Sequence, residues 1–228
     1  MGDLIVRGLR VARGEHAVLD GCSAAFPAGQ RTVLWGRSGA GKSTLLAAVA
    51  GLHIPLSGTI ALGSRVLFSS EAGIDVRPHE RGVGFVFQDL ALWPHLTAID
   101  QVRLVGRCAG LDRAGALSLL ESVGLAGLAA RRPGQLSGGE QQRLAIARAL
   151  AGKPAMLLLD EPFSSVDKET RLSLRGLLRE VSPRVSGPTI YVTHDADDAS
   201  SLAEGVVALE GGKLRPAEHP WERGEGSE

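Results

Sequence analysis

The sequence predicts an α/β fold with a mainly parallel sheet, an antiparallel β subdomain before it and a helical insertion subdomain within it. Three observations carry this prediction: short apolar runs without polar alternation, helical patterns that follow several of them, and one long stretch of purely helical composition. Such apolar runs are typical of strands buried on both faces, as in a parallel sheet covered by helices. Their alternation with helices favours the α/β class.

The expected elements separate an antiparallel part from a parallel part. Early segments broken by Gly and Pro favour antiparallel strands at 4–11, 17–26 and 59–68. The apolar runs expected in the main sheet are 32–35, 84–87, 155–159, 189–193 and 206–209. The helical patterns that follow them are 42–50, 143–151, 171–181 and 196–203. The stretch 98–128 contains no strand-like run, which predicts a helical insertion.

Length and composition suit one large domain. We expect it over residues 1–215, with a helical subdomain at about 90–150 and a loose tail, rich in Pro, Gly and charge, over 216–228. The formal net charge of +0 gives a nucleic-acid partner no electrostatic support, so we expect none. Cys22 and Cys108 form no CxxC pair, and no apolar run is long enough for a signal peptide or a membrane span.

A glycine-rich segment follows the apolar run 32–35 and opens a helical pattern, which is the context that a phosphate-binding loop requires. Lys42 supplies a point charge for β- and γ-phosphates, the Ser43 hydroxyl is placed to bind Mg²⁺, and Thr44 adds a donor near the α-phosphate. The GKS ending disfavours a Rossmann dinucleotide site. The segment therefore predicts the core of a P-loop NTPase, and its residues are Gly36, Arg37, Ser38, Gly39, Ala40, Gly41, Lys42 and Ser43.

Two adjacent carboxylates, Asp160 and Glu161, end the apolar run 155–159. Neighbouring residues of a strand point to opposite faces, so the two acids need not share a role. We expect Asp160 to reach the Mg²⁺ shell and Glu161 to act as general base for a water beyond the γ-phosphate. An acidic turn before Pro162 is the alternative, and it is compatible with a catalytic edge.

A second phosphate-friendly segment, LSGGEQQRLAIARAL, begins at Leu136. Ser137, Gly138 and Gly139 leave backbone N–H groups unobstructed where a helix begins, which suits an anion. The segment has no lysine and no metal ligand of its own. The segment therefore predicts half of a nucleotide site, and we expect the rest of the chain to supply the other half.

Together, GRSGAGKS, LSGGEQQ and LLLDEP resemble the nucleotide-binding subunit of an ATP-binding cassette (ABC) transporter over nearly the whole chain. The resemblance implies the ABC ATPase fold, ATP and Mg²⁺ as ligands, and ATP hydrolysis. In this family two cassettes associate head to tail, so the partner is a second subunit, as a homodimer. By resemblance, Ser137 and Gly139 contact the γ-phosphate that the partner's phosphate loop holds.

The resemblance also assigns residues outside these motifs. Gln88 matches a glutamine that ligates Mg²⁺ and senses the γ-phosphate, and His194 matches the switch histidine that contacts the γ-phosphate and the attacking water. Asp167 matches a loop that links the two sites of the dimer. The family places an adenine-stacking aromatic residue where this chain has Arg13. A guanidinium can stack on a purine, and His16 is a second candidate, so ATP is expected and GTP stays open.

The stretches RGVGFVFQDLALWPHLT and DEPFSSVD resemble importer cassettes for small anions, metals, sugars or polyamines. This implies a cytoplasmic protein on the inner face of the cell membrane, with permease subunits and an extracytoplasmic substrate-binding protein. The permease is expected to dock at Gln88–Leu96, whose apolar residues could equally belong to the helical core. Export or lipoprotein extraction, and a soluble non-transport ABC ATPase, are the alternatives. The sequence ends without the extra β-domain of many importer cassettes, so we expect no regulation through it.

Overall fold

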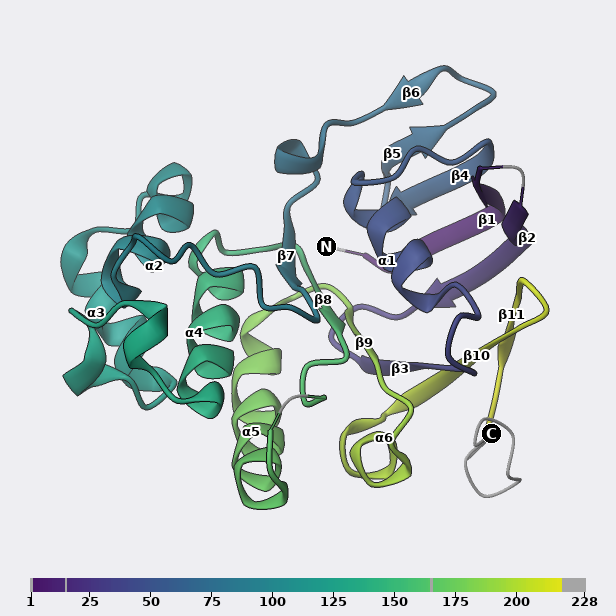
Figure 1. Cartoon of the computed structure of the whole chain (residues 1–228). Helices are drawn as coiled ribbons and strands as arrows, with labels where there is room; N and C mark the ends of the chain where they lie inside the picture. Colours follow the sequence, from purple (N-terminus) through teal and green to yellow (C-terminus); the bar gives the residue numbers. More distant parts are fainter. Residues whose placement is uncertain (1, 15, 165, 219–228) are drawn as a thin grey trace.

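The computed structural model describes residues 2–14, 16–164 and 166–218. Two sheets and a group of helices make up this part of the chain (Figure 1). The larger, six-stranded sheet has the order β11-β10-β3-β9-β8-β7 and is parallel except for its edge strand β11. Its strands are β3 (Arg31–Trp35), β7 (Val83–Val86), β8 (Met156–Asp160), β9 (Thr189–Val192), β10 (Gly205–Glu210) and β11 (Lys213–Pro216).

The five apolar runs expected in the parallel sheet all lie in it, within one residue or so of their predicted bounds. The edge strand was not expected. Pro216 ends β11, where the sequence predicted the start of a loose tail. Pairing with β10 orders the backbone there, because Ala208 and Arg215 lie opposite each other in the antiparallel register. Residues 219–228 of the expected tail lie outside the described residues.

The second sheet is antiparallel, as predicted, and has the order β2-β1-β4-β5-β6. Its strands are β1 (Leu4–Arg13), β2 (His16–Phe26), β4 (Ser57–Leu62), β5 (Arg65–Ser69) and β6 (Ile74–Asp75). The single strand expected at 59–68 is wrong: β4 and β5 form a hairpin with Leu62 opposite Arg65. The turn between them uses Gly63 at φ +57°, a backbone conformation that glycine adopts without strain.

The α-helices are α1 (Lys42–Ala50), α2 (Ala98–Gly106), α3 (Arg113–Ser122), α4 (Gly138–Ala151), α5 (Lys168–Val181) and α6 (Ala196–Leu202). The predicted helical insertion at 98–128 is confirmed by α2 and α3. Helices α4 and α5 begin earlier than their apolar patterns, because Ser137 and Asp167 cap them. Among the residues described, none of these helices has both the length and the apolar character needed to cross a bilayer.

The parallel sheet separates two hydrophobic clusters. In β8, Leu157 and Leu159 face the cluster that includes α2 to α6, while Met156 and Leu158 face the cluster that includes α1 and the antiparallel sheet. All residues of β8 are buried. This two-sided burial is why the strand reads as a continuous apolar run.

A buried arginine ties the antiparallel sheet to the end of α1. Arg81 is 1% exposed, and its Nη1 donates to the carbonyls of Ala48 and Val49, both at 2.9 Å. Its Nε donates to the carbonyl of Val76 at 2.7 Å, and its Nη2 pairs with Asp75 at 2.8 Å. Arg81 thus adds donors to two carbonyls at the C-terminal end of α1, one of which, Ala48, also accepts from the Gly51 N–H at 3.1 Å.

Replacing Arg81 by Met should therefore lower the free energy of unfolding by roughly 2–4 kcal/mol, because buried carbonyls lose their donor. Urea denaturation measures this loss. Arg65→Met, at an exposed position of β5, is the matched control and should change stability by less than about 0.5 kcal/mol. Equal stability of the two variants would contradict the role given to Arg81.

Candidate functional site

One cavity brings together residues that lie far apart in the sequence. Its volume is about 420 Å³, and it opens where the strands β3 and β8 end and α1 begins. The cavity therefore joins the glycine-rich loop to three side chains that the sequence singled out separately. Its lining is Val18, Ser38, Gly39, Gly41, Lys42, Ser43, Thr44, Gln88, Glu161 and His194.

The lysine of the loop is held inside the loop itself. Lys42 Nζ donates to the carbonyl oxygens of Gly36 at 2.7 Å and Arg37 at 2.9 Å. Burial lowers the pKa of Lys42, and the charges of Glu161 and Asp160 oppose this shift. The loop therefore presents a partly desolvated cation together with the N-terminus of α1, two features that favour a phosphate.

The loop packs tightly against β2. Gly41 has φ +103°, and a Cβ at this position would lie 2.6 Å from Val18 Cγ1. Gly41 is therefore required both by its backbone conformation and by the space beside it. Val18 was not predicted as part of the site, because nothing in its local pattern distinguishes it from other strand valines.

Ser43 and Asp160 form a second contact in the site. Ser43 Oγ donates to Asp160 Oδ1 at 3.0 Å. Burial raises the pKa of Asp160, while the bond from Ser43 and the charge of Lys42 act in the opposite direction. The hydroxyl and carboxylate oxygens, with the Gln88 amide on the same cavity, are ligands that suit Mg²⁺. Among the described residues, no three His, Cys, Asp or Glu side chains are placed so that they could hold a metal ion by themselves.

Glu161 and His194 face each other across the ends of β8 and β9. Glu161 Oε1 lies 3.4 Å from His194 Nδ1, and the Glu161 backbone N–H donates to the carbonyl of Val192 at 3.1 Å. Glu161 has φ +46°, a left-handed conformation that is strained for a residue with a side chain. Strain of this kind gathers at functional sites.

The segment after Gln88 is anchored to α4. Leu90 and Ala91 both have positive φ, at +60° and +44°, and their carbonyls accept hydrogen bonds from Arg148. The Arg148 guanidinium also lies 5.0 Å from the centre of the Trp93 ring. A groove of about 280 Å³ lies here, and the aromatic Phe85, Phe87 and Trp93 line it.

The structure shows core packing for part of the apolar stretch, and permease docking at the rest stays a prediction. Leu90 and Leu92 pack against the helical core, whereas Trp93 lines the groove. Arg148 was not predicted. Its partners lie 57 and 58 residues away along the chain, and such long-range contacts leave no local pattern.

The signature segment does not join the cavity within the described chain. Ser137 Oγ accepts from the Glu140 N–H at 3.4 Å, and Glu140 Oε2 accepts from the Ser137 N–H at 2.7 Å, which makes a capping box at the start of α4. Ser137, Gly138 and Gly139 are not among the residues that line the cavity. Helices α1 and α4 belong to different clusters on opposite faces of the sheet (Figure 1).

Asp167 likewise caps a helix. Its Oδ1 accepts from the Thr170 N–H at 3.0 Å and its Oδ2 from the Thr170 hydroxyl at 2.7 Å, and these bonds lower its pKa. It does not line the cavity. The backbone of Arg13 lies in β1, but its side chain is outside the described part of the structure, so its expected stacking on a base stays a prediction.

The ABC transporter family matches residues 19–164, a range that includes the phosphate loop, Gln88, the signature segment and the acid pair. The chain belongs to the ABC transporter family. It is 38% identical over 224 residues to an sn-glycerol-3-phosphate import ATP-binding protein of Agrobacterium fabrum, covering 96% of this chain and 58% of that protein. It is 41% identical over 223 residues to a sulfate/thiosulfate import ATP-binding protein of Rhizobium meliloti, covering 94% and 59%. The chain thus spans less than two thirds of the length of these relatives.

Solved ABC cassettes share the fold. A dimeric ATP-binding cassette in a post-hydrolysis state, bound to ADP and Pi, superposes with a TM-score of 0.80 at 29% identity and covers 95% of this chain and 98% of that one. A second dimeric bacterial ABC transporter cassette matches equally well. These likenesses confirm the predicted ABC ATPase fold.

The left-handed backbone at Glu161 should affect the free energy of unfolding of variants at this position. Glu161→Gly removes the strain, whereas Glu161→Ala removes the same side chain and keeps it. The glycine variant should therefore be more stable than the alanine variant by about 1 kcal/mol. Thermal or urea denaturation of the pair measures the difference, and a glycine variant no more stable than the alanine variant would rule out strain at this residue.

Proposed function

We propose that the chain is the ATP-hydrolysing subunit of a membrane import system. The observation that carries this proposal is the cavity that joins the phosphate loop, Gln88, Glu161 and His194. Relatives of this chain are import ATP-binding proteins, which supports import rather than export or lipoprotein extraction. The imported solute is a small anion, metal, sugar or polyamine. Other subunits of the import system determine which solute is bound.

In this proposal the phosphate loop binds the triphosphate of ATP. Lys42 turns from the carbonyls of Gly36 and Arg37 toward the β- and γ-phosphates, and Thr44 donates near the α-phosphate. Ser43, Asp160 and Gln88 hold Mg²⁺, which neutralises charge on the phosphates when it is bound. The remaining loop residues, from Gly36 to Gly41, wrap the phosphates with backbone N–H groups.

The Glu161–His194 pair then acts on the attacking water. Glu161 accepts the proton of that water as general base, and His194, 3.4 Å away, orients the water and the γ-phosphate. Gln88 lies on the same cavity and follows β7, so it responds to an occupied γ-phosphate position. Arg13 stacks on the base, for which ATP is the expected nucleotide.

The working unit of the proposal is a head-to-tail homodimer. Ser137, Gly138 and Gly139 lie outside the cavity of their own chain, which supports a role at the partner's nucleotide. The exposed N-terminus of α4 offers the N–H groups for that contact. Asp167, at the start of α5, belongs to the loop that links the two sites.

The proposal places the dimer on the inner face of the cell membrane, in the cytoplasm. A short segment of the permease subunit docks in the groove beside Gln88–Leu96, where Trp93 and Phe87 offer an apolar floor. Movement of Gln88 and movement of the docked segment are then coupled, because Arg148 ties Leu90 and Ala91 to α4. An extracytoplasmic binding protein delivers the solute, and no nucleic acid takes part.

Glu161→Gln should lower phosphate release from ATP by about 10²–10⁴-fold, since the general base is lost, while ATP binding persists and a dimer accumulates. In this background Ser137→Arg should abolish the dimer and leave ATP affinity of the monomer within about twofold, because the arginine blocks only the partner's site. Light scattering and ATP titration measure the two properties.

Ser64→Arg, at an exposed turn of the antiparallel sheet, is the matched control and should leave the dimer intact. Lys42→Ala should instead weaken ATP binding to the monomer. If Ser137→Arg weakens monomer binding as much as Lys42→Ala does, the signature acts within its own chain and the head-to-tail dimer is wrong.

The raised pKa of Asp160 makes Mg²⁺ binding depend on pH. The metal needs the carboxylate form, so its affinity for the ATP-bound protein should fall as pH falls toward that pKa. Mg²⁺ titrations at a series of decreasing pH values measure this. The Asp160→Asn variant is the control, because its Mg²⁺ affinity changes with pH only through the titration of ATP. If Mg²⁺ affinity depends on pH in the same way in the wild-type protein and in this variant, Asp160 does not ligate the metal.

A further inference from the structure

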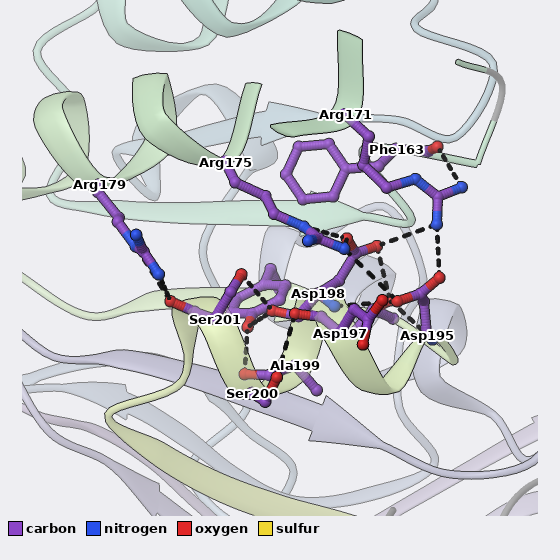
Figure 2. A network of polar contacts seen from close by, with 12 residues as sticks. Phe163, Arg171, Arg175, Arg179, Asp195, Asp197, Asp198, Ala199, Ser200 and Ser201 are labelled. Atoms are coloured by element: carbon purple, nitrogen blue, oxygen red, sulfur yellow. Dashed lines mark hydrogen bonds and ion pairs between the residues drawn. The ribbon is translucent and has the colours of Figure 1, made fainter. Parts of the chain in front are cut away.

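Helices α5 and α6 are joined by arginine–aspartate contacts (Figure 2). Arg171, Asp195 and Asp198 line the same small cavity as Glu161 and His194. Arg171 Nη1 donates to Asp195 Oδ2 at 2.5 Å. Arg175 Nε donates to Asp198 Oδ1 at 2.6 Å, and Arg179 Nε donates to the carbonyl of Ser201 at 3.0 Å. The arginines lie along one face of α5. Arg171 and Arg175 both face Asp195 and Asp198, whereas Arg179 meets the C-terminal part of α6 (Figure 2).

Arg171 differs from the other two because it reaches both catalytic loops. Its Nη2 donates to the carbonyl of Phe163 at 3.3 Å, while Nη1 holds Asp195. Phe163 follows Glu161 by two residues, and Asp195 follows His194 directly. One rigid guanidinium therefore spans the loop that carries the general base and the loop that carries the histidine (Figure 2).

Both loops need such an anchor. The His194 side chain is 60% exposed, and Glu161 is the partner found for it, so packing does little to fix the imidazole. Asp195 fixes the backbone instead: its N–H donates to Thr193 Oγ1 at 3.1 Å and its Oδ1 accepts from the Asp198 N–H at 2.9 Å. On the other loop, the left-handed Glu161 begins a turn closed by the Ser164 N–H at 3.2 Å.

The contact between Arg171 and Asp195 lies next to the Glu161–His194 pair and apart from the phosphate loop. Arg171, Asp195 and Asp198 line a small cavity of about 60 Å³, which Glu161 and His194 also line. This cavity is distinct from the larger one at the phosphate loop, whose lining does not include Arg171. Arg171 therefore lies beside the Glu161–His194 pair in the small cavity and does not line the cavity at the phosphate loop.

We propose that Arg171 is a positioning residue that sets the separation of Glu161 and His194 by holding the Phe163 carbonyl and the Asp195 carboxylate together. This inference rests on the proposed hydrolysis at that pair. Arg175 cannot replace it, since its Nη2 reaches Asp195 only at 3.6 Å and no bond joins it to the loop after Glu161 among the described residues.

The test compares Arg171→Met with Arg179→Met, which cuts a contact between the same two helices far from His194. Arg171→Met should lower kcat for ATP roughly 10- to 100-fold with KM within about twofold, because misplaced reacting groups slow the chemical step more than binding. Arg179→Met should leave kcat within about twofold. In a His194→Ala background the Arg171→Met loss should shrink to about twofold, since coupled residues are not additive.

Hydrogen exchange in nucleotide-free protein gives a readout that needs no hydrolysis. Amide exchange over 161–164 and 193–195 should rise in Arg171→Met and stay at the wild-type level in Arg179→Met. Arg171→Lys is the fallback if the methionine variant does not fold. It keeps a cation beside Asp195 and should still lower kcat, because one ammonium cannot span both loops.

Unchanged exchange in both loops, or an equal fold loss of kcat with and without His194, would overturn the positioning role. Absence of hydrolysis in the wild-type protein would contradict the proposed function instead. The exchange measurement would then still decide whether Arg171 holds the two loops.

Discussion

The burial of β8 on both faces is the constraint on which the rest of the structure depends. Because the side chains of this strand alternate between two clusters, α1 and the antiparallel sheet must pack on one side and α2 to α6 on the other. The strand can end only where the clusters end, so its last residue, Asp160, meets the start of α1 at Ser43. The next residue, Glu161, has a left-handed backbone and donates its N–H to the carbonyl of Val192 in β9. Site geometry and core packing are thus consequences of one strand.

Much of the fold could be predicted from the sequence because its signals are local. The five buried strands are apolar runs, and the helix starts at Lys42, Ser137 and Asp167 carry glycine or capping residues. The grouping of Gln88, Glu161 and His194 at the phosphate loop followed from the family resemblance, and the structure brings these residues to one cavity. Each of them lies at or just after the end of a parallel strand, where side chains of different strands meet.

The features that the sequence did not predict depend on contacts between distant residues. Arg148 reaches back 57 and 58 residues, Arg81 joins α1 to the antiparallel sheet, and Arg171 bridges two loops. The position of such an arginine follows no periodic pattern in the sequence. Its partners are often backbone carbonyls, and because every residue has one, the sequence does not mark them. The hairpin at Gly63 was missed for a simpler reason, since both of its short strands are similar in composition and only the turn separates them.

The carbonyls of Gly36 and Arg37 compete with any anion for the Lys42 ammonium group, because both accept hydrogen bonds from it. An anion can bind the lysine only by replacing these two hydrogen bonds. An anion that makes few other contacts therefore gains little net binding free energy. A polyphosphate that engages the whole loop replaces both carbonyl bonds at once and uses the helix end as well. From this competition we expect the loop to favour ligands that present several phosphate oxygens at once over single small anions.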